Sequence, residues 1–117
     1  LYRAVIMTGA VANPYAGEVA LVIDGERHVL KLTLGALAEL EAALETGTLV
    51  ELVERFESGA FSSRDVLALI VAGLRGGGWR GQAADLVSAR IEGGALGAAR
   101  AAAELLARAF MAPGAGA

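Results

Sequence analysis

Hydrophobic and polar residues alternate near the start of the chain and then change to a spacing typical of helices. Two short alternating runs, 18–24 (EVALVID) and 27–32 (RHVLKL), flank the dipeptide Asp24-Gly25. A type I′ turn needs positive φ at both central residues, so Asp-Gly between such runs is a common hairpin signature. The pattern therefore predicts an antiparallel β-hairpin over 18–32.

The length of the turn decides which side chains of the hairpin face the core. With a two-residue loop, one face carries Val19, Leu21, Ile23, His28, Leu30 and Leu32. The opposite face then carries Ala20, Val22, Arg27, Val29 and Lys31. A loop one residue longer would reverse this partnering, because side chains alternate between faces. A lone hairpin is marginal in water, so we expect it to pack on helices or to extend its sheet with another subunit.

Apolar residues at helical spacing, with start and stop signals, predict the helices that follow. Thr33 is the expected N-cap of the first helix. The pairs Thr48/Glu51 and Ser62/Asp65 match capping boxes, in which a hydroxyl and a carboxylate each bond a free backbone amide. The predicted helices cover 34–45, 48–57, a segment from Ser62 to the glycine run at 76–78, 82–92 and 95–111.

This order of elements predicts an α+β fold, in which an N-terminal β-hairpin precedes a bundle of four to five short α-helices. A length of 117 residues favours one domain, which we place at 13–111, with the hairpin at 18–32 and helices at 34–111. We interpret residues 1–12 as a flexible leader and residues 112–117 as a disordered tail. Val11 could mark an alternative start.

The composition narrows the classes of partner. The chain is 56% hydrophobic and 20% charged, which is typical of a folded protein. A net charge of -3 without a basic stripe argues against nucleic acid. The apolar runs are shorter than the roughly 20 residues that span a bilayer, so we expect no membrane partner. The absence of Cys excludes thiolate chemistry and fits a reducing compartment. We expect a cytoplasmic location in a bacterial host cell.

No motif indicates catalysis, a cofactor or a metal. His28 is the single histidine, and its surroundings favour an ordinary strand residue over a catalytic or ligand role. The run Gly76-Gly77-Gly78 follows a helix and lacks the Lys and Ser/Thr spacing of a phosphate-binding loop, which favours a helix C-cap and hinge. An acidic tract is interpreted as a solvated face or as a surface for a basic partner; it comprises Glu39, Glu41, Glu45, Glu51, Glu54 and Glu57. We expect a protein that is not an enzyme.

Two regions are candidates for partner binding. Trp79 is the lone Trp and lies next to Arg80, and exposed Trp and Arg side chains are typical interface anchors, although core anchoring is equally compatible. The last predicted helix ends in large apolar residues, which either dock on the domain or are held for a partner. The expected partner-binding residues are Trp79, Arg80, Leu105, Leu106 and Phe110.

An ordered series of residues resembles a known family. The segments that carry it are 12–44 and 55–78, with Asn13-Pro14 before Gly17-Glu18, the Asp24-Gly25 turn, the run 32–37 (LTLGAL), and Ala72-Gly73-Leu74-Arg75 before the glycines. The chain resembles the tail assembly chaperones of gene transfer agents and phages, small tail proteins encoded upstream of the tape measure. Residues 1–10 lie outside this resemblance, and Val11 stands where the family usually has Met.

The resemblance implies a non-enzymatic tail assembly chaperone of a gene transfer agent or phage-like particle. Such a protein would bind the tape-measure protein, recruit tail-tube subunits and be absent from the mature particle. Members of the family are also described as tail-tube components, so the alternative is a structural tail-tube subunit. We disfavour that alternative here because tube proteins normally need a larger sheet and one hairpin supplies two strands. Self-association is a further option.

Overall fold

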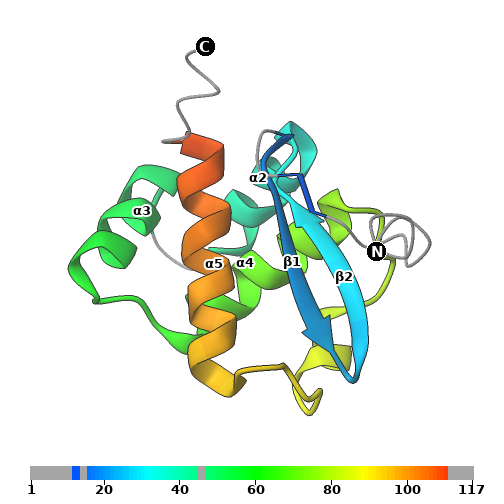
Figure 1. The fold of residues 1–117 in the computed structure, drawn as a ribbon. Helices are drawn as coiled ribbons and strands as arrows, with labels where there is room; N and C mark the ends of the chain where they lie inside the picture. The colour runs from blue at the N-terminus through cyan, green and yellow to red at the C-terminus, as the bar shows by residue number, and fades with distance from the viewer. Residues whose placement is uncertain (1–11, 14–15, 45–46, 111–117) are drawn as a thin grey trace.

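A hairpin followed by helices is the observed architecture of the computed structural model, which describes residues 12–13, 16–44 and 47–110 (Figure 1). The predicted α+β fold is therefore confirmed. The expected leader, except Ala12, and the expected tail lie outside the described residues. The elements are β1 (Glu18–Ile23), β2 (Glu26–Lys31), α2 (Leu34–Ala43), α3 (Leu49–Ser58), α4 (Ser63–Gly76), the 3₁₀ helix η2 (Ala83–Leu86) and α5 (Gly94–Phe110).

The hairpin has the two-residue turn that the sequence predicts. Asp24 and Gly25 both have positive φ, 52° and 79° respectively, as a type I′ turn requires. The antiparallel register pairs Leu21 with His28 and Val19 with Leu30. The expected inward face is confirmed, because its members Val19, Leu21, Ile23 and Leu30 are buried.

Helix α4 occupies the centre of the fold. Gly73 allows this position, because a Cβ there would come within 2.7 Å of a Leu105 side-chain carbon on α5 and 3.1 Å of the Leu30 Cβ on β2. In Figure 1, α5 lies between α3 and the hairpin, and α4 runs behind it. The core is built mainly from aliphatic side chains of β1, β2, α4 and α5, with Leu40 and Leu52 added from α2 and α3.

Both outer edges of the hairpin meet other parts of the chain. On the β1 side, the Asp24 N–H donates to the Arg90 carbonyl at 2.7 Å, and the Glu92 N–H donates to the Val22 carbonyl at 2.9 Å. On the β2 side, a Cβ on Gly76 would collide with the Lys31 carbonyl oxygen. The hairpin therefore packs on the helices of its own chain, the first of the two arrangements expected for it.

The three predicted N-caps are confirmed. The Thr33 hydroxyl accepts from the Ala36 N–H at 3.1 Å at the start of α2. Thr48 with Glu51, and Ser62 with Asp65, form reciprocal capping boxes at the starts of α3 and α4. No helix in the described part of the chain has the length and apolar character needed to cross a bilayer.

The predicted helix over 82–92 is wrong. Only Ala83–Leu86 is helical there, as the 3₁₀ turn η2, and Ile91 forms a β-bridge with Ile23. The Asp24 carboxylate also accepts from the Arg90 N–H at 2.8 Å. Pairing with the hairpin edge therefore satisfies the backbone of 90–92 in place of helical hydrogen bonds, and Val87 is left exposed.

Candidate interaction surface

Trp79 and Arg80 follow the C-terminal end of α4. Gly77 is the C-cap of α4, as expected, and lies against the Val29 carbonyl, where a Cβ would collide. The hinge stays a prediction. The Trp79 ring lies over Gly81 and is half-buried against the core. Arg80 is exposed. Of this pair, Arg80 is accessible to a partner and Trp79 is partly so.

Arg75 holds the segment after α4 in place. Its guanidinium donates to Glu39 on α2 at 3.2 Å, to the Gly81 carbonyl at 3.2 Å and to the Gln82 side chain at 3.2 Å. These bonds fix the course of the chain around Trp79, because one planar group bridges two helices and a loop. From the sequence, Arg75 was singled out only within the segment 72–75 that carries the family resemblance.

The last helix separates its three candidate residues. Leu105 and Leu106 are buried in the core, whereas Phe110 is 45% exposed. The two leucines were expected on a contact surface, and their burial corrects that expectation. They share one side of α5 with Ala98, Ala101 and Ala102, and this side faces α4 and β1. Phe110 is the last residue of α5 and is distant in sequence from Trp79 and Arg80. Partner binding by these three residues stays a prediction.

Four other large apolar side chains are exposed among the residues that the structure describes. None of them was named as a contact residue from the sequence, and they are Leu34 (84%), Val50 (66%), Val87 (75%) and Leu96 (67%). Leu34, Val50 and Leu96 each lie in the first turn of a helix, and Val87 follows η2. The sequence feature that could have identified the first three as exposed is their position in the first turn of a helix. A first turn can extend beyond the core.

An apolar groove of about 480 Å³ lies between α4, the segment 86–91 and the start of α5. No charged side chain lines it. Small residues of α5 form one wall and larger apolar residues form the other. Its lining includes Phe61, Val66, Ile70, Val87, Ala95 and Ala99. A groove of this composition suits an apolar side chain of another protein, and offers nothing to a nucleic acid or an ionic ligand.

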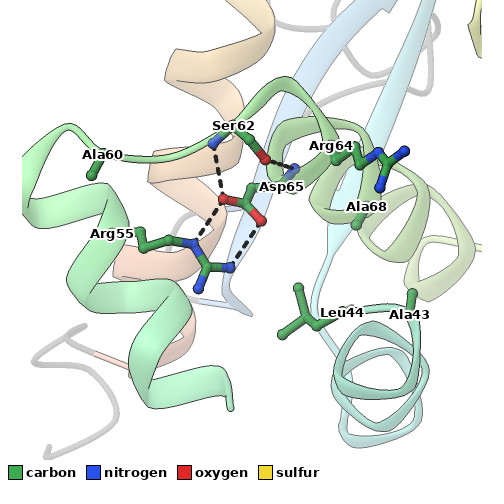
Figure 2. Close-up of a pocket in the computed structure, with 8 residues that line it drawn as sticks. All are labelled: Ala43, Leu44, Arg55, Ala60, Ser62, Arg64, Asp65 and Ala68. Carbon is green, nitrogen blue, oxygen red and sulfur yellow. Dashed lines mark hydrogen bonds and ion pairs between the residues drawn. The ribbon is translucent and has the colours of Figure 1, made fainter. Parts of the chain in front are cut away.

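A charged cluster joins α3 to α4 beside a smaller pocket of about 260 Å³ (Figure 2). Arg55 donates through Nε and Nη2 to the two carboxylate oxygens of Asp65, both at 2.9 Å. The Ser62 N–H donates to the same carboxylate at 2.9 Å. The hydrogen bonds from Arg55 hold the pKa of Asp65 below its usual value of 3.8, and the same pairing raises the pKa of Arg55.

This cluster is a structural clamp rather than acid–base machinery. A carboxylate that accepts three charged or backbone hydrogen bonds is held ionised, so it is a poor general acid or base near neutral pH. The bidentate geometry of Arg55 and Asp65 also fixes the orientation of α3 on α4.

Elsewhere in the described part of the chain, the ion pairs join two side chains each. His28 Nε2 lies 3.5 Å from a carboxylate oxygen of Glu26 on the same strand. Among the residues that the structure describes, no three His, Asp or Glu side chains are placed to hold a metal ion. The glutamates of the acidic tract are exposed where they are described, and Glu45 lies outside the described residues.

A comparison with protein families decides the relationship. The family model described as "Phage tail tube protein, GTA-gp10" matches residues 16–112. The chain belongs to this family of phage tail tube proteins. No curated protein and no solved structure matches it. The gene transfer agent and phage tail part of the sequence resemblance is therefore confirmed for this tail tube family member.

The expected role of tail assembly chaperone is wrong for this tail tube family member, because the matched family is described as a tube protein. A tube subunit was disfavoured from the sequence because one hairpin supplies only two strands. A sheet in an assembly can be completed by strands from several subunits, so two strands in a monomer do not exclude a tube.

Proposed function

We propose that this chain is a structural subunit of the tail tube of a phage-like or gene transfer agent particle, in which it associates with copies of itself. The observation that carries the proposal is the family match over 16–112. Exposed apolar side chains away from α5, such as Leu34 and Val50, support it, because a polymer of identical subunits needs apolar contact surface outside the monomer core. The capped helices and the clamped ion pair suit a subunit that keeps one shape.

We also propose that the chain acts without catalysis. Among the described residues, Asp65 is a carboxyl group with a lowered pKa, and its hydrogen-bond partners are Arg55 and the capping Ser62. Those partners explain the perturbation as helix docking and helix capping. A tube subunit requires neither a cofactor nor a metal for this role.

The partner and location follow from the tube role. We propose synthesis in the bacterial cytoplasm and retention in the finished particle, in place of the absence from the particle expected from the sequence. Tube subunits would be the principal partners. Contact with the tape-measure protein, where it occurs, would be made by the assembled tube wall and not by the free chain.

Purified particles test this proposal directly. Quantitative mass spectrometry should find the chain at many copies per particle, and gold-labelled antibody should mark the tail along its length. Deletion of the gene should give heads without tails, and expression of the chain from a plasmid should restore them. Absence of the chain from tailed particles would overturn the proposal, whatever the effect of the deletion.

A further inference from the structure

The outer side of α5 carries an apolar stripe that the monomer leaves uncovered. Leu96 is 67% exposed at the start of the stripe and Phe110 is 45% exposed at its end. Ala99, Ala103 and Ala107 follow between them at three- and four-residue spacing, which places all five on one side of the helix. Small side chains in the middle of the stripe allow another helix to approach closely.

The N-terminal end of this stripe opens into the apolar groove. Ala95 and Ala99 line the groove, and Leu96 lies beside them on the helix surface. The groove has a volume of about 480 Å³ and an apolar lining, which suits a large apolar side chain such as that of Phe110. The same helix thus carries a projecting aromatic residue at one end and an apolar recess at the other.

Two opposite charges lie along one edge of the stripe. Arg100 and Glu104 are both exposed and lie one turn apart on α5. In the part of the chain that the structure describes, Arg100 forms no ion pair, and Glu104 contacts Arg108 at 3.4 Å. Arg100 is therefore available to a neighbouring chain, and the Glu104 carboxylate, 49% exposed, has room for a second cation beside Arg108.

These features are self-complementary about one point of α5. Arg100 and Glu104 each lie two residues from Ala102, and Gly94 and Phe110 each lie eight residues from it. In two antiparallel copies of α5 centred at this level, Arg100 would meet Glu104 of the second copy. Because the helix rise is constant at about 1.5 Å per residue, Phe110 would reach the level of the groove in the same arrangement.

We propose that two copies of the chain pair through α5 in an antiparallel, two-fold contact, with Phe110 of each copy seated at the apolar groove of the other. A second copy is the occupant because both the charge pair and the projection-and-recess pair match at the same centre. A partner of other sequence would have to reproduce both by coincidence. Antiparallel helices place equivalent flanks on the same side, so the two Arg–Glu pairs form together.

This contact goes beyond the proposed tail-tube role and does not depend on it. A two-fold contact is satisfied by two copies, whereas a tube grows through head-to-tail contacts between unlike surfaces. The α5 pair therefore cannot propagate a tube. It pairs subunits that are outside the tube, and covers an apolar face that would otherwise be exposed to water.

Cysteine cross-linking tests the geometry cleanly because the chain has no Cys. Ala103→Cys lies one residue from the centre, so two copies should bring its thiols close enough to form a disulfide dimer under mild oxidation. Ala107→Cys lies on the same stripe but about 15 Å from its counterpart along the helix axis, and should not cross-link. Leu34→Cys, exposed on α2, is the control for random collision.

Charge exchange tests the pairing independently. Arg100→Glu and Glu104→Arg should each weaken the dimer about tenfold in sedimentation equilibrium, because each puts like charges opposite one another. The double exchange restores opposite charges and should return the dimer to within about threefold of wild type. Both residues are exposed, and unchanged thermal unfolding of each variant will show that the fold is intact.

A wild-type chain that stays monomeric at all concentrations overturns the α5 pair, as does a dimer in which Ala107→Cys or Leu34→Cys cross-links as efficiently as Ala103→Cys. A double exchange no better than the single changes overturns the Arg–Glu pairing. None of these results bears on the presence of the chain in particles. The tail-tube proposal therefore stands or fails on the particle experiment alone.

Discussion

The carboxylate of Asp65 has two structural tasks at once. It completes the capping box of α4 with Ser62 and holds the guanidinium of Arg55 on α3. The capping task was predictable from the sequence, because Ser62 and Asp65 have the required spacing. The ion pair was not, because Arg55 and Asp65 are ten residues apart and meet only when α3 folds back toward the start of α4.

Replacing Asp65 with Asn should separate these tasks. The amide oxygen can still accept from the Ser62 N–H, but the bidentate charge pair is lost and Arg55 keeps an unmatched charge. We expect the free energy of unfolding to fall by about 2 kcal/mol, near the lower end for paired charges because Arg55 is partly exposed. Urea unfolding at pH 7 measures the change. Glu54→Gln, at an exposed position of α3, is the matched control and should have little effect.

The effect of Asp65→Asn should depend on pH in a defined direction. Because the folded-state pKa of Asp65 lies below the usual value of 3.8, the pair contributes its full stability above that value. The contribution is lost as pH falls from about 4 through the folded-state pKa. Wild type and variant should therefore converge in stability in acid. A constant difference from pH 7 to pH 2 would show that the charge is not responsible.

Gly76 shows a second residue-scale constraint. Helix α4 approaches the backbone of β2 closely there, and a Cβ would collide with the Lys31 carbonyl oxygen. We expect Gly76→Ala to lower stability by about 2 kcal/mol, because backbone cannot yield as a side chain can. Gly35→Ala is the control, since its Cβ would have 4.0 Å of space and should stabilise α2 by up to about 1 kcal/mol. Thermal unfolding of both variants checks the opposite signs.

At the scale of elements, local signals predicted those parts of the chain that local interactions determine. The hairpin register followed from Asp24-Gly25, and the starts of α2, α3 and α4 followed from their caps. The segment 82–92 differed because its partner, the hairpin edge, is distant in sequence. A short apolar run with weak helix signals takes whichever backbone pairing the fold offers, and periodicity alone cannot identify it.

The bond between Asp24 and Arg90 provides an element-scale prediction. Asp24→Gly keeps the positive φ of the turn but removes the carboxylate that accepts from the Arg90 N–H. We expect the Arg90 amide to exchange its hydrogen roughly fivefold faster, which corresponds to about 1 kcal/mol for an exposed bond to a charged acceptor. Asp24→Asn retains an acceptor and tolerates the same φ, and should remain near wild type. Equal rates in all three proteins would mean that the backbone bonds alone hold this segment.

At the scale of the whole molecule, the fold class was easier to predict than the role. Element order determines an α+β layout, but the same ordered residues were compatible with a tail chaperone and with a tail-tube protein. Which surfaces remain exposed depends on packing, and the sequence pattern assigned Leu105 and Leu106 to a surface although α5 turns them toward the core. Apolar spacing identifies a helix face without saying what covers it.

The described fold also divides into a tightly packed centre and a more peripheral helix. The closest backbone packing involves the hairpin, α2, α4, α5 and η2. Helix α3 is held instead through its side chains. These contacts are the buried Leu52, the half-buried Leu49 and Val53, the stacking of Phe56 on Phe61 and the Arg55–Asp65 pair. Regions held by few contacts open at lower free energy than the global unfolding reaction.

Native-state hydrogen exchange should therefore resolve α3 from the centre. We expect the amides of α4 and β2 to exchange only through global unfolding, and those of α3 through an opening that needs less free energy. Asp65→Asn should lower the free energy of the α3 opening by about 2 kcal/mol, because the Arg55–Asp65 pair breaks when α3 opens. It should lower the free energy of global unfolding as well, because the pair also breaks in that reaction. Gly76→Ala, which acts between α4 and β2, should leave the α3 opening unchanged while it lowers the global energy. If α3 and α4 exchanged with one common energy in all three proteins, the clamp would be part of a single cooperative unit, and α3 would be a rigid face for neighbouring subunits.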